Sequence, residues 1–274
     1  MKIDNYKNIE FLNIADPGIF LNSTPVLFKY MTLENAISTL EKHTIWLANP
    51  GTWKDPFEKR FLFANYSKAS GKVNSFPYFE RTFATCLTCN SSSEAQWSAY
   101  SENEIAIRFK INTEVLLEQL DEFALKHPKY KVFFGKVEYH KREEIKTELS
   151  KLSFEEEARG KTIKKSLHSI PFCARLLLLK RKDFEYEDEC RIIVFKDVKS
   201  KADGIGFNYS CVNNLIFPLL TISPSVKHNV EKMLKEYLKQ YDMDFYPDSR
   251  GRHRPRVEKS HLYDENEKGA KIII

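Results

Sequence analysis

The chain has 274 residues, which is enough for one domain with a sizeable core or at most two small ones, and no linker is evident. Its 43 lysines and arginines against 38 aspartates and glutamates give a net charge of +5, a mild excess that permits a polyanionic partner without requiring one. Five cysteines are too sparse for a secreted disulfide scaffold, and no apolar stretch approaches about 18 residues, so we expect a cytoplasmic protein with reduced thiols and no membrane partner.

The N-terminal part of the chain predicts three strands and a helix. Residues 26–30 have the apolar composition of a short strand, and Thr32 can cap a helix that follows it with apolar residues at helical spacing. A second strand over 45–48 ends in Asn49-Pro50-Gly51, a sequence typical of turns. Residues 82–88 then have the character of a buried strand.

The middle of the chain alternates between helix and strand. A Ser-rich turn precedes a helix that carries Trp97 and Tyr100 on one face, and residues 105–111 alternate between apolar and polar as a half-buried strand does. Apolar residues at helical spacing predict a helix over 113–126, just before Pro128. Residues 130–139 again have strand character.

The rest of the chain predicts a helical insertion over about 141–180 and then further strands and a helix. The apolar run 176–179 fits either type of element. We therefore predict an α+β fold, a single domain over 1–274 with a core over about 25–260 and a mixed, mostly antiparallel sheet. The later elements are expected as strands over 190–196 and 215–222, a helix over 225–240, and short strands near 242–246 and 254–259.

The most informative stretch carries Glu187, Glu189 and Arg191 immediately before a β-branched run. Residues two apart on a strand share one face, so the two carboxylates would project side by side about 7 Å apart. Paired carboxylates at a strand edge can carry out acid–base chemistry. The same three charged residues can instead belong to an exposed, salt-bridged strand, in which each ion pair contributes well under about 1 kcal/mol to stability.

A basic run near the C-terminus resembles a nucleic-acid contact patch, although a solvated basic loop has the same appearance. Its arginines are Arg250, Arg252, Arg254 and Arg256.

We expect no metal site. Cys86 and Cys89 form a C-x-x-C, but no second pair completes four zinc ligands, and the seven histidines are scattered. The chain also lacks a phosphate-binding G-x-x-x-x-G-K-[ST] loop, a G-x-S-x-G nucleophile elbow and a G-x-G-x-x-G dinucleotide motif.

Four short motifs in register resemble those of a large bacterial family of domains of unknown function. They are Lys29-Tyr30, Lys54-Asp55-Pro56-Phe57-Glu58, Trp97-Ser98-Ala99-Tyr100 and Glu187-Asp188-Glu189-Cys190-Arg191. Lys54 departs from the pattern, since the family usually has asparagine there. The family is similar to the ADP-ribosyltransferase-like superfamily, as in the DarT-like toxins, whose members split an NAD pocket between two small sheets.

The resemblance implies a split sheet, NAD as substrate, and roles for particular residues. Lys29 or Tyr30 would seat NAD, and Thr88, with Thr85 as the alternative, would shape the pocket. Glu189 would contact the nicotinamide ribose and stabilise the positive charge that develops there as the bond to nicotinamide breaks. Glu187 would orient or deprotonate the attacking group of the acceptor, which is the work of a general base.

The resemblance gives the remaining site residues supporting roles. Arg191 would hold Glu189 in place, and Asp55 and Glu58 would line the pocket mouth, unless Asp55 only caps a turn. The aromatic residues Trp53, Trp97 and Tyr100 would either stack on a ring of NAD or fill the core.

The function implied is that of an NAD-dependent mono-ADP-ribosyltransferase, acting as a bacterial toxin or antiviral effector. Its acceptor would be nucleic acid, RNA or DNA, with a protein target left open, and an antitoxin partner could control it. The first alternative is a nucleic-acid or nucleotide binding module without turnover. The second is a metal-dependent nuclease, if folding gathers Glu187, Glu189 and Asp55.

Overall fold

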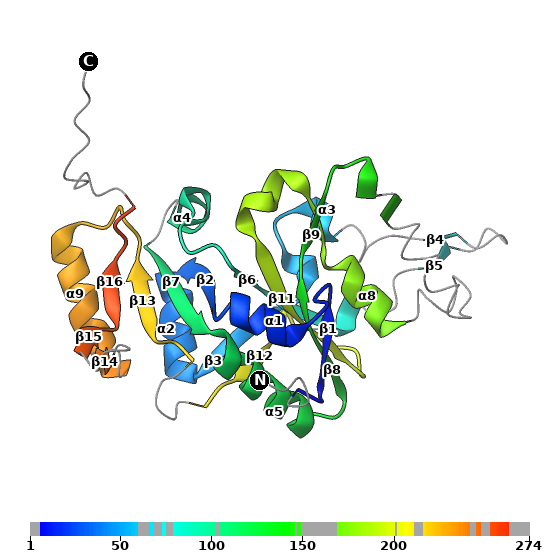
Figure 1. The fold of residues 1–274 in the computed structure, drawn as a ribbon, viewed down its shortest axis with the longest axis horizontal. Coiled ribbons are helices and arrows are strands. Elements are labelled where there is room, and N and C mark those ends of the chain that lie inside the picture. The colour runs from blue at the N-terminus through cyan, green and yellow to red at the C-terminus, as the bar shows by residue number, and fades with distance from the viewer. Residues whose placement is uncertain are drawn as a thin grey trace, which may run out of the picture.

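The computed structural model describes residues 6–59, 66–67, 73–74, 79–101, 105–145, 147–148, 169–200, 202–210, 216–241, 245–247 and 253–262. These residues build a ten-stranded sheet with helices packed around it (Figure 1). Its main path runs β1-β8-β11-β6-β2-β7-β13-β16, and β3 joins β6 and β12 beside that path. The strands are β1 (Ile9–Leu12), β2 (Val26–Thr32), β3 (Thr44–Ala48), β6 (Thr82–Thr88), β7 (Ala106–Asn112), β8 (Tyr130–Lys136), β11 (Glu189–Lys196), β12 (Gly204–Asn208), β13 (Leu219–Ile222) and β16 (Val257–Lys259).

The sheet is mixed and mostly antiparallel, which confirms the predicted α+β class. Among the described strands of this ten-stranded sheet, only the outer pairs are parallel, namely β1 with β8 and β13 with β16. The described helices are α1 (Pro17–Ser23), α2 (Leu33–Lys42), α3 (Pro56–Lys59), α4 (Glu94–Ser101), α5 (Thr113–Lys126), α8 (Ile170–Leu176) and α9 (His228–Leu238), with 3-10 turns η2 (Pro50–Thr52), η3 (Phe79–Arg81), η4 (Lys182–Glu187) and η6 (Lys239–Tyr241). Each of these helices is too short or too polar to cross a membrane.

Three small two-stranded sheets accompany the large one. They pair β9 (Glu138–His140) with β10 (Leu179–Arg181), β14 (Phe245–Pro247) with β15 (His253–Pro255), and β4 (Tyr66–Ser67) with β5 (Val73–Asn74). The apolar run 176–179 therefore divides between the end of α8 and the start of β10. The strand predicted over 215–222 is shorter, because only Leu219–Ile222 pairs with β7.

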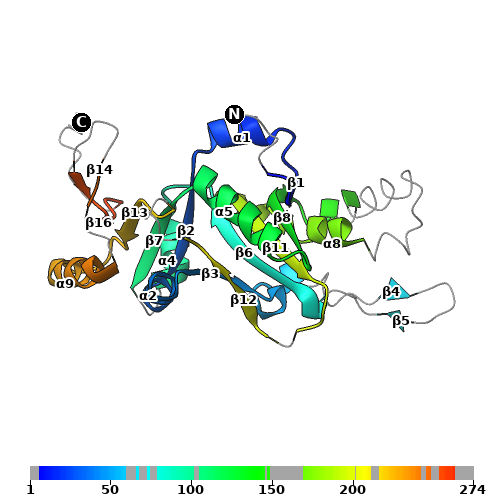
Figure 2. The same cartoon turned by 90° about the horizontal axis from the view of Figure 1, so that it is seen from below.

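The sheet splits between β2 and β6. These strands pair at one position, Phe28 opposite Thr88, whereas β6 and β11 pair over the whole length of β6. Figure 2 shows β6 and β11 running at a steep angle to β2 and β7. The right-handed twist of strands accumulates across a sheet, so strands that diverge after one pair divide the sheet into two halves.

Two helices, α2 and α5, begin where the sequence predicts, and side chains satisfy some of their first free N–H groups. The hydroxyl of Thr32 accepts a hydrogen bond from the amide of Asn35 at 3.3 Å, and the side chain of Asn112 accepts one from Val115 at 3.2 Å.

Removing the Thr32 cap should therefore cost stability. We expect Thr32→Ala to lower the free energy of unfolding by about 1 kcal/mol, since one helix donor loses its partner. Chemical denaturation measures this loss. Ser38→Ala, inside the same helix, is the matched control and should be neutral or slightly stabilising. Equal effects at the two positions would contradict the capping role.

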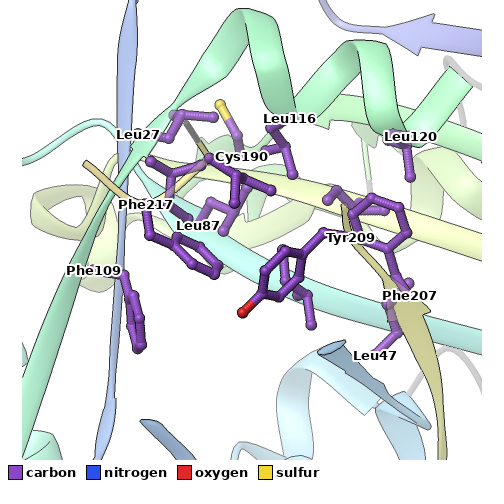
Figure 3. Packing of buried hydrophobic residues seen from close by; sticks show 14 of the residues in the cluster. Leu27, Leu47, Leu87, Phe109, Leu116, Leu120, Cys190, Phe207, Tyr209 and Phe217 are labelled. Carbon is purple, nitrogen blue, oxygen red and sulfur yellow. The ribbon is translucent and has the colours of Figure 1, made fainter. Parts of the chain in front are cut away.

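The core lies on both faces of β11. Cys190, Ile192 and Val194 face a large cluster beneath α5, which Figure 3 shows from close by with Leu116 and Leu120 packed over the strands. Ile193 and Phe195 face a second cluster beneath α8. Because residues alternate between faces, Glu189 and Arg191 lie on the α8 side of the sheet.

Most of the predicted helical insertion lies outside the described residues. Within 141–180 the structure describes 141–145, 147–148 and the part from residue 169 onward, where α8 occurs. The limits of the domain and of the insertion remain predictions.

Candidate functional site

The site is centred on Glu189 and Arg191 at the start of β11. Both are buried, at 6% and 1% exposed. The Nη2 and Nε atoms of Arg191 donate to Oε2 of Glu189 at 2.6 and 3.1 Å. The spacing of two on a strand produces this pair, because it sets both side chains on one face.

Glu187 does not lie on the strand, so the prediction that it projects beside Glu189 from one strand face is wrong. It ends the 3-10 helix η4, and Asp188 then adopts a left-handed backbone with φ of 40° and ψ of 59°. Aspartate is among the few residues that tolerate this conformation. The hydroxyl of Thr88 donates to the Glu187 carbonyl and helps to hold the turn.

Lys180, on β10, nevertheless brings the two carboxylates together. Its Nζ donates to Oε2 of Glu187 at 2.7 Å and to Oε1 of Glu189 at 3.2 Å. Lys180 is 4% exposed. Sequence reasoning missed it, and the available signal was a lysine directly after four consecutive leucines. A charged residue placed there is buried and needs partners.

Glu58 completes an ionic cluster on the α8 side of the sheet. This residue of α3 lies 3.0 Å from Lys180 Nζ through Oε1 and 2.6 Å from Arg191 Nη2 through Oε2. Three carboxylates thus face two cations, which leaves an excess negative charge when all are ionised. The ring of Trp53 lies under the Arg191 guanidinium at 4.7 Å, so it stacks on this side chain.

The cluster drives the two catalytic candidates toward different protonation states. Burial, a hydrogen bond with Glu189 and the negative charge of Glu189 together raise the pKa of Glu187 to about 7. Burial acts in the same direction on Glu189, but Arg191 and Lys180 overcome it and lower the pKa of that carboxyl to about 2. Near neutral pH, Glu189 is ionised and Glu187 can exchange a proton.

Lys29 bridges the split in the sheet. Its Nζ donates to Oγ1 of Thr85 at 2.7 Å and to the carbonyl of Cys86 at 3.1 Å, so it connects β2 to β6. Burial lowers the pKa of Lys29. Of the two predicted threonines, Thr85 thus binds Lys29, whereas Thr88 binds the Glu187 turn.

Aromatic residues of β2 and α4 pack against one another near these groups. Tyr30 is buried and packs edge-on against Trp97, with ring centroids 4.8 Å apart. Trp97 is 1% exposed and fills the core. Tyr100 stacks on Tyr30 at 6.5 Å, is 41% exposed, and has a pKa raised by burial of its hydroxyl and by nearby Cys86 and Glu189. Because this residue is exposed, its ring is available to a ligand.

Asp55 fastens a loop. Its Oδ2 lies 3.0 Å from Nη2 of Arg181, which links the Asp55-to-Glu58 segment to the residues before η4. The Asp-Pro-Phe-Glu segment thus contributes two carboxylates to ion pairs with neighbouring residues of β10, Asp55 to Arg181 and Glu58 to Lys180.

The predicted basic patch is only partly described. Arg256 is 5% exposed and donates through Nη2 to the Phe217 carbonyl at 2.6 Å, so its inclusion among exposed nucleic-acid contacts is wrong. A buried guanidinium bound to a carbonyl serves packing. Arg250 and Arg252 lie outside the described residues, as does the side chain of Arg254 on β15.

The segment that runs from α4 through Arg191 carries two of the four sequence motifs and most of this cluster. A family model matches it. Residues 96–192 match DUF2971, whose description is a protein of unknown function. The DUF2971 match confirms the resemblance to a family of unknown function, and it covers less than half of the chain.

No protein of curated function matches the chain. Solved structures of DarT from Thermus sp. 2.9 are similar to it at low identity. The complex with ADP-ribosylated ssDNA has a TM-score of 0.36 and 11% identity, covering 87% of this chain and 95% of that one. The complex with NAD+ has a TM-score of 0.34 and 12% identity, covering 86% of this chain and 96% of that one.

Proposed function

We propose that this protein is an NAD-dependent mono-ADP-ribosyltransferase whose substrate binds beside Glu187 and Glu189, where the sheet splits. The observation that carries the proposal is the carboxyl pair itself. Both members bind one ammonium, yet one is held ionised and the other has a pKa near neutrality. Environments that separate the pKa values of two carboxyls assign them different roles in catalysis.

Glu189 has the role of electrostatic stabiliser. NAD supplies the ADP-ribosyl group and loses nicotinamide, and its ribose gains positive charge as that bond breaks. An ionised, fixed carboxylate stabilises such charge most strongly where water is excluded. Arg191 and Lys180 fix Glu189, and the cluster has a net negative charge when Glu58 and Glu187 are both ionised.

Glu187 has the role of general base toward the acceptor. Its side chain is 18% exposed against 8% for Glu189, so it is the carboxyl that an incoming acceptor reaches. A base with a pKa near the working pH combines a useful ionised fraction with a strong pull on the proton.

Residues near the pair fit a nicotinamide nucleotide. Gln96 is buried, its Nε2 donates to the Glu187 carbonyl at 3.4 Å, and its Oε1 has no hydrogen-bond partner among the described residues. A buried acceptor of this kind suits an amide N–H. The exposed ring of Tyr100 suits stacking, and the Lys29 ammonium suits a phosphate.

The proposal extends to an acceptor and a setting. We propose nucleic acid, RNA or DNA, as the acceptor, supported by the net charge of +5 and by Arg250, Arg252 and Arg254 in the sequence. A bacterial toxin or antiviral effector in the cytoplasm, held in check by an antitoxin, is the setting that agrees with the family resemblance. A protein acceptor is the other outcome of the test below.

The two alternatives fit the geometry less well. A metal-dependent nuclease needs carboxylates that converge on a cation, but here Glu58, Glu187 and Glu189 converge on the Lys180 ammonium. No group of metal ligands occurs in the described part of the chain. A binding module without turnover does not call for a carboxyl whose pKa lies near neutrality, and such carboxyls are concentrated at catalytic sites.

The test is nicotinamide release from labelled NAD by the folded protein, with protein, RNA and DNA each supplied as acceptor. Transfer of label to one acceptor class would identify it. No release with any acceptor, from protein with native circular dichroism, would overturn the proposal in favour of the binding module.

The pH dependence of turnover tests the base. Because Glu187 must be deprotonated to accept a proton, we expect kcat to be low below its pKa of about 7 and to rise through that value. Glu187→Gln should lower transfer and remove this limb of the profile. If kcat still rises through the same pH range in Glu187→Gln, another group is responsible for that rise.

A further inference from the structure

Two cysteines meet on the face of the sheet opposite the ionic cluster. Cys89 follows the last residue of β6, Cys190 is the second residue of β11, and their Sγ atoms lie 3.8 Å apart. The amide of Cys89 donates to the Asp188 carbonyl at 2.9 Å, which fixes the two backbones side by side. Figure 3 shows the Cys190 side chain directed into the core below α5.

We propose that Cys89 and Cys190 are a dithiol modification site, which low-molecular-weight disulfides convert reversibly into an intramolecular disulfide. A disulfide needs its sulfurs about 2.05 Å apart, so the pair must close by roughly 1.8 Å. Rotation of the Cys89 side chain can supply that movement, because this residue lies just beyond the end of β6 and is half-buried.

The surroundings of the pair set the order of reaction. A hydrogen bond with Cys190 lowers the pKa of the Cys89 thiol against the effect of burial, while the same contact and burial raise the pKa of Cys190. Lys136 lies opposite Cys190 on β8 and pairs with Asp188 at 3.2 Å, so a cation stands beside the thiols. Cys89 is also the more accessible of the two, since Cys190 is fully buried.

The exchange proceeds in two balanced steps with oxidised glutathione as the oxidant. The Cys89 thiolate attacks one sulfur, a Cys89–glutathione disulfide forms, and one glutathione thiolate leaves. Cys190 then loses its proton and attacks the Cys89 sulfur, which releases the second glutathione. Two protein thiols are oxidised to one disulfide, and one oxidised glutathione is reduced to two thiols that hold the two protons.

The experiment incubates the reduced, full-length protein with oxidised glutathione at fixed ratios to glutathione. Intact mass and non-reduced peptide mapping then follow the thiols. We expect loss of two hydrogens, a peptide that links Cys89 to Cys190, and unfolding at a higher denaturant concentration, because a cross-link constrains the unfolded chain. Cys190→Ala should stop at the mixed disulfide on Cys89, and Cys89→Ser should form neither product.

Cys173→Ala, which removes a fully buried cysteine elsewhere, is the matched control and should still form the link. A disulfide that joins either residue to Cys211, which lies outside the described residues, would overturn the proposal. Cys89 and Cys190 that both stay free in oxidised glutathione without any added glutathione would also overturn it. These readouts involve no NAD, so they stand apart from the proposed transferase activity.

Discussion

Replacing Arg191 with methionine is expected to lower the free energy of unfolding by about 3–5 kcal/mol, enough to remove much of the stability of an ordinary domain. The methionine fills a similar volume but leaves Glu58 and Glu189 without their shared guanidinium. A third bond, from Nη1 to the Leu177 carbonyl at 2.6 Å, is lost as well. Removal of one partner from a buried ion pair costs more than the pair contributes, because the remaining charge is desolvated.

Urea denaturation of the wild type and the variant measures this loss. Lys182→Met is the matched control, since its ion pair with Glu185 is exposed and about 3.9 Å long, and it should change the free energy of unfolding by well under about 1 kcal/mol. Addition of Glu58→Gln and Glu189→Gln to the Arg191 variant should recover part of the loss. A cost near that of the Lys182 variant would show that solvent already reaches the cluster.

The sequence predicted those features that depend on local periodicity. The helix over 113–126 and the strand over 82–88 lie at the predicted residues, because apolar spacing and an Asn112 cap determine them locally. The contact between Glu189 and Arg191 follows from a strand spacing of two in the same way.

The rest of the site depends on contacts between residues far apart in the sequence. Glu58 meets Arg191 only because α3 folds onto β11, and Lys180 meets Glu187 across a 3-10 turn. Asp188 has a left-handed backbone conformation, so Glu187 does not continue the strand of Glu189. The sequence gives no sign of this turn, because the residue is neither glycine nor asparagine. Arg256 was predicted to be exposed because its sequence neighbours are basic, but its side chain is buried and donates to the Phe217 carbonyl.

Glu189→Gln is expected to reduce nicotinamide release by about 100- to 1000-fold, the loss typical when one fixed electrostatic group is removed from a transition state. The substitution preserves shape, and the amide oxygen can still accept from Arg191. What it removes is the negative charge that Arg191 and Lys180 hold ionised even under moderately acidic conditions. Release from labelled NAD at saturating concentration measures kcat, and denaturation checks that the fold is kept.

Glu185→Gln distinguishes the loss of the Glu189 charge within the cluster from an equal change in net charge outside it. Glu185 lies on η4 only four residues from Glu189, with a side chain 58% exposed, so its loss changes the net charge equally without touching the cluster. We expect wild-type release from this variant. Equal losses in the two variants would indicate a long-range effect of net charge, and unchanged release in Glu189→Gln would assign the stabilising role to another carboxylate of the cluster. The two results together therefore decide whether the buried ionic cluster exists to hold one reactive carboxylate or to join α3, β10 and β11.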